Sequence, residues 1–287
     1  MALQIFTNIV TQNAQRNLTV NNSRLESSIR QVASGQRLQK AGDDSASFSI
    51  SQSIRSDNLV LRQASRNAND AISLVNTVEG SIGEVSSILI RLRELSQQSA
   101  SGTISDTDRE SVQLEFSQLR EELDRIANTT EFNGQKLLEG SLSNGASNPS
   151  IIQTGLDGST ANRFNLNEIL DVSDLRSATT GLDQLAVNTQ EGALAASGAI
   201  EALIDDIIES RSRVAVASER LASTVSYLDR SVEENTRADS ILTDADLGEG
   251  FADLTRNQIL VQASTAMVGQ ANLNPQSVFE ALVSTII

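Results

Sequence analysis

The chain has 287 residues, of which 39% are hydrophobic and only 3% aromatic, and its formal net charge is −15. This acidic balance, with dispersed arginines, argues against binding to nucleic acid or to acidic membrane surfaces. The absence of histidine and cysteine excludes disulfides, thiolate nucleophiles, histidine general bases and the usual zinc sites.

The first residues lack the pattern of a cleavable signal peptide. The first basic residue is Arg16, and polar residues interrupt the apolar ones before it. A signal peptide has a basic start followed by a continuous apolar run. No stretch approaches the roughly 18 apolar residues of a transmembrane helix either. We expect no membrane insertion, and a protein that is cytosolic or exported by a route that reads no such signal.

The N-terminal segment predicts an amphipathic helix that reaches about Ala41. Its apolar residues recur at helical spacing: Leu3, Phe6, Val10, Ala14, Leu18, Leu25, Ile29 and Val32. Its outer face is rich in Asn and Gln, so we expect this helix to be marginal on its own.

The stretch SGQRLQKAGDDSAS (34–47) then interrupts the helical pattern. It holds two basic residues, a glycine and two adjacent aspartates: Arg37, Lys40, Gly42, Asp43 and Asp44. Adjacent carboxylates indicate a metal site, acid–base chemistry or the start of a helix. Without histidine or a further acid at ligand spacing, we interpret the stretch as a joint between domains. Gly42 would adapt to the turn, either aspartate would cap the next helix, and the two bases would face acidic partners.

The clearest signal in the chain is a heptad repeat that begins at Leu61. Apolar residues alternate steps of three and four for more than four heptads, which is typical of a coiled-coil seam: Leu61, Ala64, Ala68, Ala71, Val75, Val78, Ile82, Val85, Leu89 and Leu92. A helix over residues 50–96 would be roughly 70 Å long at 1.5 Å per residue.

A second helix is expected after the turn SGTISDTDRE (101–110), with Ser105 or Asp106 as its cap. Its expected seam is Val112, Phe116, Leu119, Leu123 and Ile126. The Asn-Gly pair at 133–134 ends the helical pattern. Residues 141–178 read as an irregular region with a β-hairpin around Asp157-Gly158.

Heptads resume for a long helix with small and hydroxyl residues in its seam: Ala193, Ala196, Ile200, Leu203, Ile207, Ser210, Val214, Ala217, Leu221, Thr224 and Leu228. A break at 242–250 precedes a last amphipathic helix. The predicted fold is therefore mainly α, an elongated coiled-coil-like bundle of long antiparallel helices with a small central β-hairpin region.

The organisation is mirror-like, with a shorter helix, a break and a longer helix at each end. Such marginal terminal helices could fold by pairing with each other and with other copies, which suggests a rod that polymerises. We expect a seam at the two ends that packs between copies as well as within one: Leu3, Phe6, Val10, Leu18, Leu25, Leu254, Val261, Val268 and Leu282.

Several long motifs, in one order, resemble those of bacterial flagellin over nearly the whole chain. They are ASGQRLQKAGDDSAS, QASRNANDAISLVNTVEG, RLRELSQQSASG and ELDRIANTTEFNGQKLL in the N-terminal half, with RADSILTDAD and LTRNQILVQASTAMVGQANLNPQSV near the C-terminus. Only about 40 residues separate the helices at the hairpin, so the resemblance is to a short form without the outer variable domains. Ile90 stands where the family often has Gln.

This resemblance implies a structural filament subunit for motility that is neither an enzyme nor a cofactor protein. Residues 1–41 and 242–287 would form the innermost domain and residues 42–241 the outer rod. It also implies type III export to the extracellular filament, a cytosolic export chaperone, and contacts with filament-cap and hook-junction proteins. Arg91, Leu95 and Glu115 fall on the family's contact positions for the innate-immune flagellin receptor.

Two alternatives remain open. A hook–filament junction protein shares the terminal motifs but would assemble as a limited ring. A secreted hydrolase that uses clustered carboxylates is the alternative from another class, although the zinc-protease insertion of some flagellins needs a His-x-x-x-His arrangement that this chain lacks.

Overall fold

The computed structural model describes residues 8–286, with the side chains of residues 8–273. The chain forms two compact units, which we name the terminal unit (Met1–Ser56 and Asn235–Ile287) and the central unit (Asp57–Glu234). Their limits fall inside two long helices, α2 (Ser45–Ala100) and α6 (Gln190–Thr243), so each of these helices contributes to both units.

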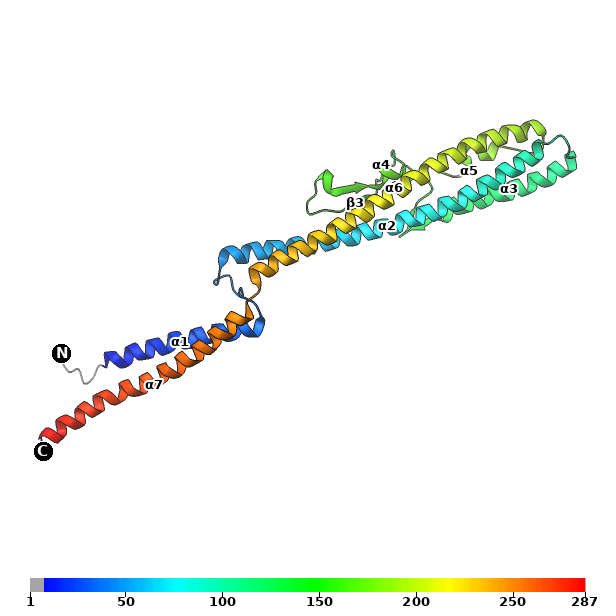
Figure 1. The fold of residues 1–287 in the computed structure, drawn as a ribbon. Helices are drawn as coiled ribbons and strands as arrows, with labels where there is room; N and C mark the ends of the chain where they lie inside the picture. Colours follow the sequence, from blue (N-terminus) through cyan, green and yellow to red (C-terminus); the bar gives the residue numbers. More distant parts are fainter. Residues whose placement is uncertain (1–7, 287) are drawn as a thin grey trace. The chain divides into compact units, whose positions relative to one another are not determined.

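Three antiparallel helices form the body of the central unit, namely α2, α3 (Asp106–Thr129) and α6 (Figure 1). Hydrogen bonds between α2 and α6 record an antiparallel register: Gln97 to Ser197 at 2.6 Å, Arg93 to Glu201 at 2.8 Å and Ser65 to Asp229 at 3.1 Å. At 56 residues, α2 is about 84 Å long. The prediction of a mainly α fold with long antiparallel helices is confirmed.

Helix α3 begins where the sequence indicates. The Ser105 hydroxyl accepts a hydrogen bond from the Asp108 N–H at 3.3 Å, and the Asp108 carboxylate accepts one from the Ser105 N–H at 3.4 Å. This reciprocal capping box satisfies two N–H groups that have no partner within the helix. Asp106 and Asp108 also place negative charge at the positive end of the helix dipole.

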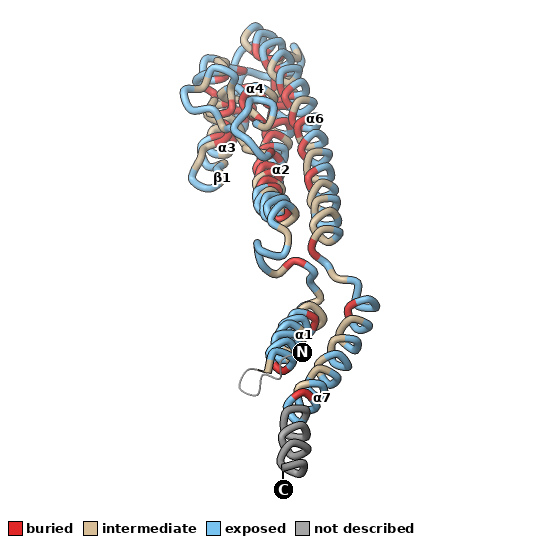
Figure 2. Tube along the Cα trace, turned by 90° about the vertical axis from the view of Figure 1, so that its left-hand side faces the viewer, coloured by how far each residue is buried: buried red, intermediate tan, exposed pale blue. Residues whose placement is uncertain are grey.

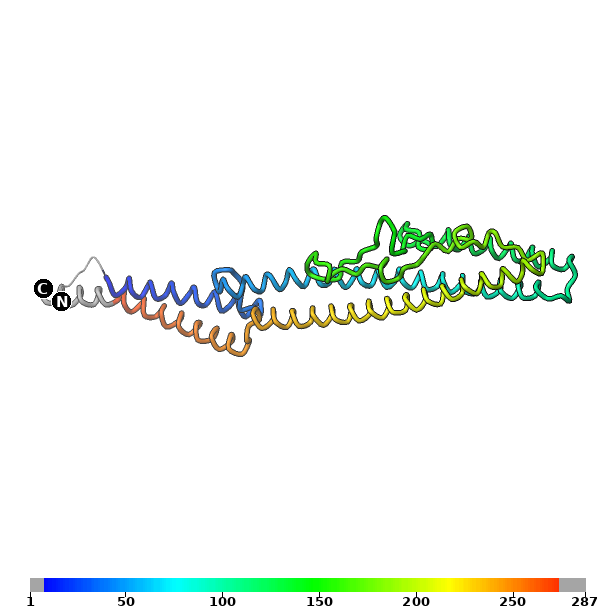
Figure 3. Tube along the Cα trace, turned by 90° about the horizontal axis from the view of Figure 1, so that it is seen from above, coloured from blue at the N-terminus to red at the C-terminus, as the bar shows by residue number. Residues whose placement is uncertain are grey.

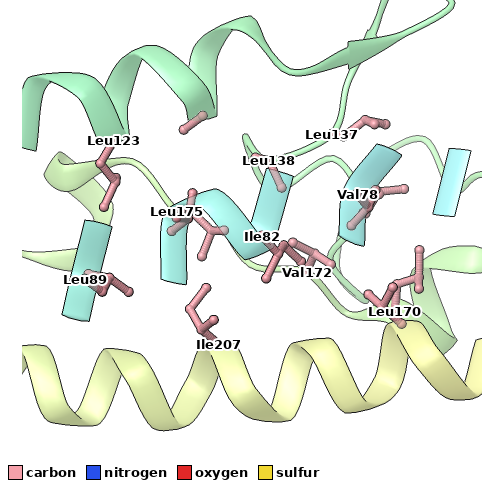
Figure 4. Close-up of a cluster of buried hydrophobic side chains, with 14 of the residues drawn as sticks. Val78, Ile82, Leu89, Leu123, Leu137, Leu138, Leu170, Val172, Leu175 and Ile207 are labelled. Carbon is pink, nitrogen blue, oxygen red and sulfur yellow. The ribbon is translucent and has the colours of Figure 1, made fainter. Parts of the chain in front are cut away.

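The heptad seam predicted for α2 is confirmed, because every seam residue from Leu61 to Leu92 is buried. In the central unit these side chains meet the buried faces of α3 and α6, and Figure 2 shows the buried positions as stripes along the helices. The irregular segment that follows α3 fills the rest of the core. Figure 4 shows Leu137, Leu138, Leu170, Val172 and Leu175 packed with α2, α3 and α6 side chains.

Two small antiparallel sheets lie in the irregular segment. In the first, Asn133 (φ 51°) and Gly134 (φ 79°) join β1 (Glu131–Phe132) to β2 (Gln135–Lys136), the positive pair that a tight hairpin turn requires. The predicted hairpin around Asp157-Gly158 is also present, as β3 (Ile151–Gln153) paired with β4 (Arg163–Asn165).

The connection between β3 and β4 is longer than a two-residue turn and contains the 3₁₀ helix η1 (Thr160–Asn162). Asp157 stabilises it by accepting a hydrogen bond from the Ser159 N–H at 3.1 Å. Three short elements then lead to α6, namely α4 (Leu166–Leu170), α5 (Ser177–Thr180) and η2 (Leu182–Gln184).

In the terminal unit, α1 (Ile9–Ser34) and α7 (Leu247–Ile286) lie side by side (Figures 1 and 3). The Asn8 side chain caps α1 by accepting from the Thr11 N–H at 3.1 Å. Helix α1 ends earlier than the predicted Ala41, because Gly35 adopts the left-handed conformation (φ 68°) and its N–H bonds the Gln31 carbonyl.

The expected domain boundaries at 41/42 and 241/242 lie near breaks between helices, whereas the limits of the two compact units fall inside helices. The assignment of an inner and an outer layer stays a prediction.

Candidate functional site

The seam between α1 and α7 follows an unbroken heptad on both helices, but alternate seam positions are polar. On α1 it runs Thr11, Ala14, Leu18, Asn21, Leu25, Ser28 and Val32, and on α7 it runs Gly250, Leu254, Asn257, Val261, Ser264, Val268 and Ala271. All of these residues are buried or half-buried. The seam therefore alternates apolar packing with polar positions along its length.

Hydrogen bonds join the polar positions across the seam, and we name them the polar ladder. Its rungs are Asn257 to Ser28 Oγ at 2.8 Å, Asn21 to Ser264 Oγ at 2.6 Å, and Asn8 and Thr11 to the Ala271 carbonyl at 2.9 and 3.3 Å. On α7 the rungs recur every seven residues. A polar seam residue fixes the register of paired helices and lowers their stability. The ladder therefore defines one antiparallel register for a weakly held helix pair.

Large apolar side chains lie on the outside of the same helix pair. On α7, Phe251, Ile259 and Met267 are 55%, 59% and 62% exposed. Further exposed apolar residues are Leu247, Leu260 and Leu273 on α7 and Ile9, Val10, Val20 and Ile29 on α1. A helix that is apolar on several faces is typical of an element buried in a larger structure. The chain alone covers only one of those faces.

The residues predicted for polymerisation occupy different places. Leu18, Leu25, Leu254, Val261 and Val268 are half-buried in the seam within one chain, and their packing between copies stays a prediction. Val10 is instead 61% exposed, because Thr11 takes the seam position and hydrogen-bonds the Ala271 carbonyl. Leu3, Phe6 and Leu282 lie outside the residues whose side chains the structure describes.

Of the two aspartates of the predicted joint, Asp44 caps α2 and Asp43 closes the turn before it. Asp44 accepts hydrogen bonds from the N–H groups of Ala46 and Ser47, both at 3.2 Å, at the start of α2. Asp43 accepts from the N–H groups of Gln39 and Lys40 at 3.1 and 3.0 Å and so closes the preceding turn. No group of three or more acidic residues placed to hold a metal occurs among the described residues.

Hydrogen bonding lowers the pKa of both carboxyl groups. For Asp44 the main cause is the Ser47 hydroxyl, followed by the Ser47 N–H. For Asp43 the main causes are the N–H groups of Gln39 and Lys40. Both carboxylates therefore stay ionised at neutral pH.

The structure adds two details to the predicted joint. The Arg37 guanidinium donates to the Leu242 carbonyl at 2.7 Å, and its charge also helps to lower the pKa of Asp44. Gly42 lies in a turn as expected but has no positive φ, whereas the left-handed glycine of this stretch is Gly35. The joint is made chiefly from backbone, because the Arg37 N–H bonds the Thr243 carbonyl at 2.7 Å and the Ala245 N–H bonds the Gly35 carbonyl at 2.9 Å.

Sequence reasoning missed one ion pair beside the joint. Asp239 on α6 accepts from the Ser51 hydroxyl at 2.5 Å and from Arg55 Nε at 2.9 Å. Ser51 and Arg55 are four residues apart and share one face of α2, and this spacing could have indicated a common polar partner. Their partner lies far away in the sequence, so spacing alone could not identify it.

Sequence reasoning also missed a buried arginine at the α2–α3 turn. Arg109 donates to the Ser99 carbonyl at 3.0 Å, to the Ser101 carbonyl at 2.9 Å and to Asp106 at 2.8 Å. A buried guanidinium is stable only when its donors are satisfied in this way.

The three residues predicted as a receptor patch do not share one surface. Arg91 and Glu115 meet in a half-exposed ion pair at 2.6 Å, and Arg91 also bonds Glu94 at 2.9 Å. Hydrogen bonding to Glu115, and then to Glu94, raises the pKa of Arg91. Leu95 is only 1% exposed and belongs to the core, so its side chain cannot contact a partner while the central unit is folded.

Among the described helices, none combines the length and the apolar character that a membrane span requires. The functional features of the described residues are thus helix faces, caps and ion pairs.

Comparison with known proteins identifies the family. The model of the bacterial flagellin N-terminal helical region matches residues 5–143, and that of the C-terminal helical region matches residues 197–282. Flagellin of Halalkalibacterium halodurans is 36% identical over 275 residues, which cover 96% of this chain and 98% of that protein. Flagellin of Bacillus subtilis is 33% identical over 304 residues, which cover 98% and 100% of the two chains.

A flagellar filament 30.7 kDa core protein of Treponema maltophilum is 31% identical over 283 residues, which cover 96% of this chain and 98% of that protein. A crystal structure of Bacillus cereus flagellin aligns with a TM-score of 0.48 and 26% identity, covering 57% of this chain and 88% of that one. With both family regions matched and full-length relatives above 30% identity, this chain belongs to the bacterial flagellin family.

Proposed function

We propose that this flagellin, a structural subunit of the flagellar filament, polymerises by covering the outward apolar faces of α1 and α7 with neighbouring copies. The observation that carries the proposal is the arrangement of the helix pair. Its seam holds the polar ladder, while Phe251, Ile259 and Met267 lie exposed outside.

The energetics favour assembly over an isolated helix pair. Burying apolar surface contributes about 25 cal/mol per Å², and in one chain much of the apolar surface of α7 stays in water. Binding to the folded form stabilises it by mass action. The helix pair can therefore separate during export and become stable only when neighbouring copies add their contacts.

The test is a pair of matched substitutions on α7 in the full chain. The double variant Phe251→Ser and Ile259→Ser should raise the critical concentration for polymerisation at least tenfold, measured by sedimentation and electron microscopy. The control Gln258→Ser and Gln262→Ser changes exposed polar residues of the same helix and should polymerise like the parent. Equal polymerisation of both variants would contradict the proposal.

A truncation provides a second test. Removing the chain after Leu254 deletes most of α7 but leaves the central unit intact. The truncated chain should stay a soluble, helical monomer that forms no filaments, and tubes of normal appearance would refute the proposed role of α7.

We infer the remaining partners from family membership. Export would use the flagellar type III route without a cleavable signal peptide, with a cytosolic chaperone, and growth would take place beneath a filament cap on hook-junction proteins. The product would be an extracellular filament. For the innate-immune receptor, Arg91 and Glu115 are the half-exposed contact candidates, whereas Leu95 is buried.

The alternatives lead to distinct outcomes. A hook–filament junction protein would stop at a limited ring, so unlimited growth of purified protein into tubes favours the filament subunit. Catalysis is not part of the proposal, and incubation with peptide or glycan substrates should leave them unchanged.

A further inference from the structure

Two Asn-Gly pairs lie in the irregular segment that follows α3, at 133–134 and 144–145. Such a pair can modify itself without an enzyme. The glycine nitrogen loses its proton and attacks the asparagine side-chain carbonyl carbon, and the side-chain nitrogen leaves with a proton as ammonia. Water then opens the five-membered succinimide to aspartate or isoaspartate. Glycine allows the attack because it has no Cβ and its backbone turns freely, so the rate depends on how firmly each pair is held.

The first pair, Asn133 and Gly134, is held in a hairpin turn. Its φ values are 51° and 79°, and the paired strands β1 and β2 begin on either side of it. The Glu131–Lys136 ion pair at 2.8 Å joins the same two strands. To close the ring, the peptide between the two residues must rotate out of the turn that an Asn-Gly pair favours. We therefore expect this pair to react slowly in the folded chain.

The second pair, Asn144 and Gly145, lies in an exposed loop whose two ends are fixed. The buried Asn167 side chain holds both ends, because it donates to the Ser141 carbonyl at 2.7 Å and accepts from the Ser150 N–H at 2.6 Å. Most residues between these anchors are exposed, and no helix or strand is formed there. An exposed loop tip of this kind opens locally at little cost in free energy.

Two backbone hydrogen bonds shape the loop tip, and neither occupies the reacting atoms. The Asn144 N–H bonds the Asp171 carboxylate at 2.9 Å, and the Ala146 N–H bonds the Ser143 carbonyl at 3.1 Å. Neither the Gly145 N–H nor the Asn144 side-chain amide bonds any residue that the structure describes. The attacking nitrogen and the amide that it attacks are therefore both available.

The Asp-Gly pair at 157–158 can form the same ring, but its carboxylate is engaged. Asp157 accepts from the Ser159 N–H at 3.1 Å and from the Asn162 side chain. Hydrogen bonding to Ser159, and then to Asn162, lowers the pKa of Asp157. An ionised carboxylate is a poor target for a nucleophile, so we expect this pair to remain unmodified.

We propose that Asn144 is a site of spontaneous deamidation in the folded chain, whereas the hairpin protects Asn133. The modification does not depend on polymerisation. It is irreversible because the ammonia is lost, so the modified fraction rises with the age of the molecule. An aspartate at position 144 places a second carboxylate beside Asp171. An isoaspartate also lengthens the backbone of the turn by one methylene group, which disrupts its hydrogen bond to Asp171.

The test is a time course of the purified full chain at mildly alkaline pH, followed by digestion and mass spectrometry. Trypsin separates the two sites, since Lys136 lies between them. Exchange of the side-chain NH₂ for OH raises the peptide mass, and chromatography separates aspartate from isoaspartate peptides. In the folded chain Asn144 should deamidate at least tenfold faster than Asn133. In denaturant the two rates should approach each other, because the hairpin is then lost.

The matched control is Gly145→Ala. Apart from the adjacent residues, no described atom lies within 4 Å of the position that the new Cβ would take, and Gly145 is not left-handed, so the turn should keep its shape. The Cβ hinders the attack, so deamidation of Asn144 should slow at least tenfold. Equal rates at Asn144 and Asn133 in the folded chain would overturn the inference. So would a Gly145→Ala variant that deamidates as fast as the parent.

Discussion

The central and terminal units are both built from long paired helices, but their seams differ in chemistry. In the central unit, seam positions from Leu61 to Leu92 are continuously apolar and fully buried. In the terminal unit, every second seam position on α1 is polar from Leu18 to Val32, and large apolar side chains such as Phe251 and Ile259 are exposed. A seam of the first kind stabilises a single chain, whereas the second kind leaves stability to be gained from other molecules.

The largest expected difference between the two units comes from shortening one buried side chain in each. Phe116 is completely buried in the central unit, so Phe116→Ala should lower the free energy of unfolding of that unit by about 3–5 kcal/mol. Val261→Ala, in the half-buried α1–α7 seam, should cost about 1 kcal/mol or less.

Chemical denaturation of the unpolymerised chain, followed by circular dichroism, checks this prediction. Equal losses for the two substitutions would mean that the seams contribute equally and would contradict the contrast between the units.

A middle-sized effect concerns the polar ladder. Asn21→Ala removes the 2.6 Å bond to Ser264 and should destabilise the helix pair by about 1 kcal/mol. The double variant Asn21→Leu and Ser264→Ala replaces both partners with apolar groups and should be neutral or stabilising. Amide hydrogen exchange of α1 in the monomeric chain measures both. If the double variant loses as much protection as the single one, the ladder is not what makes this seam weak.

The smallest expected effect is the pH dependence of the joint. The pKa values of Asp43 and Asp44 are lowered in the folded chain, so their contribution to stability is present above the ordinary carboxyl pKa of about 4 and is lost as the pH falls through the lowered values. Relative to the intrinsic exchange rate at each pH, the protection of the Ala46 and Ser47 amides should therefore fall at acid pH. In Asp43→Ala with Asp44→Ala this protection should already be low at neutral pH, and its further fall at acid pH should be smaller.

The same double variant should impair filament assembly or alter filament shape, because the start of α2 is no longer fixed. An unchanged filament would show that the caps are dispensable for assembly.

Heptad spacing predicted the central unit well, because a continuous apolar repeat has only one buried face. The same reasoning misplaced Val10 and Ile29, since it followed apolar residues where Thr11 and Ser28 occupy the true seam. Those polar residues are recognisable as seam positions only when their partners on α7 are known. For Leu95 the spacing was the better guide, because its position three residues after Leu92 already indicated burial. The resemblance to a family contact position led instead to its prediction as a receptor contact.

By itself, the sequence determined the helical fold, the hairpin around Asp157-Gly158, the caps of α2 and α3 to within two residues each, and the family, since each depends on local chemistry or a continuous motif. Only the tertiary structure decided which side chains meet across long separations: Arg37 with the Leu242 carbonyl, Ser51 and Arg55 with Asp239, and the rungs of the polar ladder. The physical reason is that local periodicity defines the faces of each helix, whereas the register between two helices depends on packing that brings distant residues together.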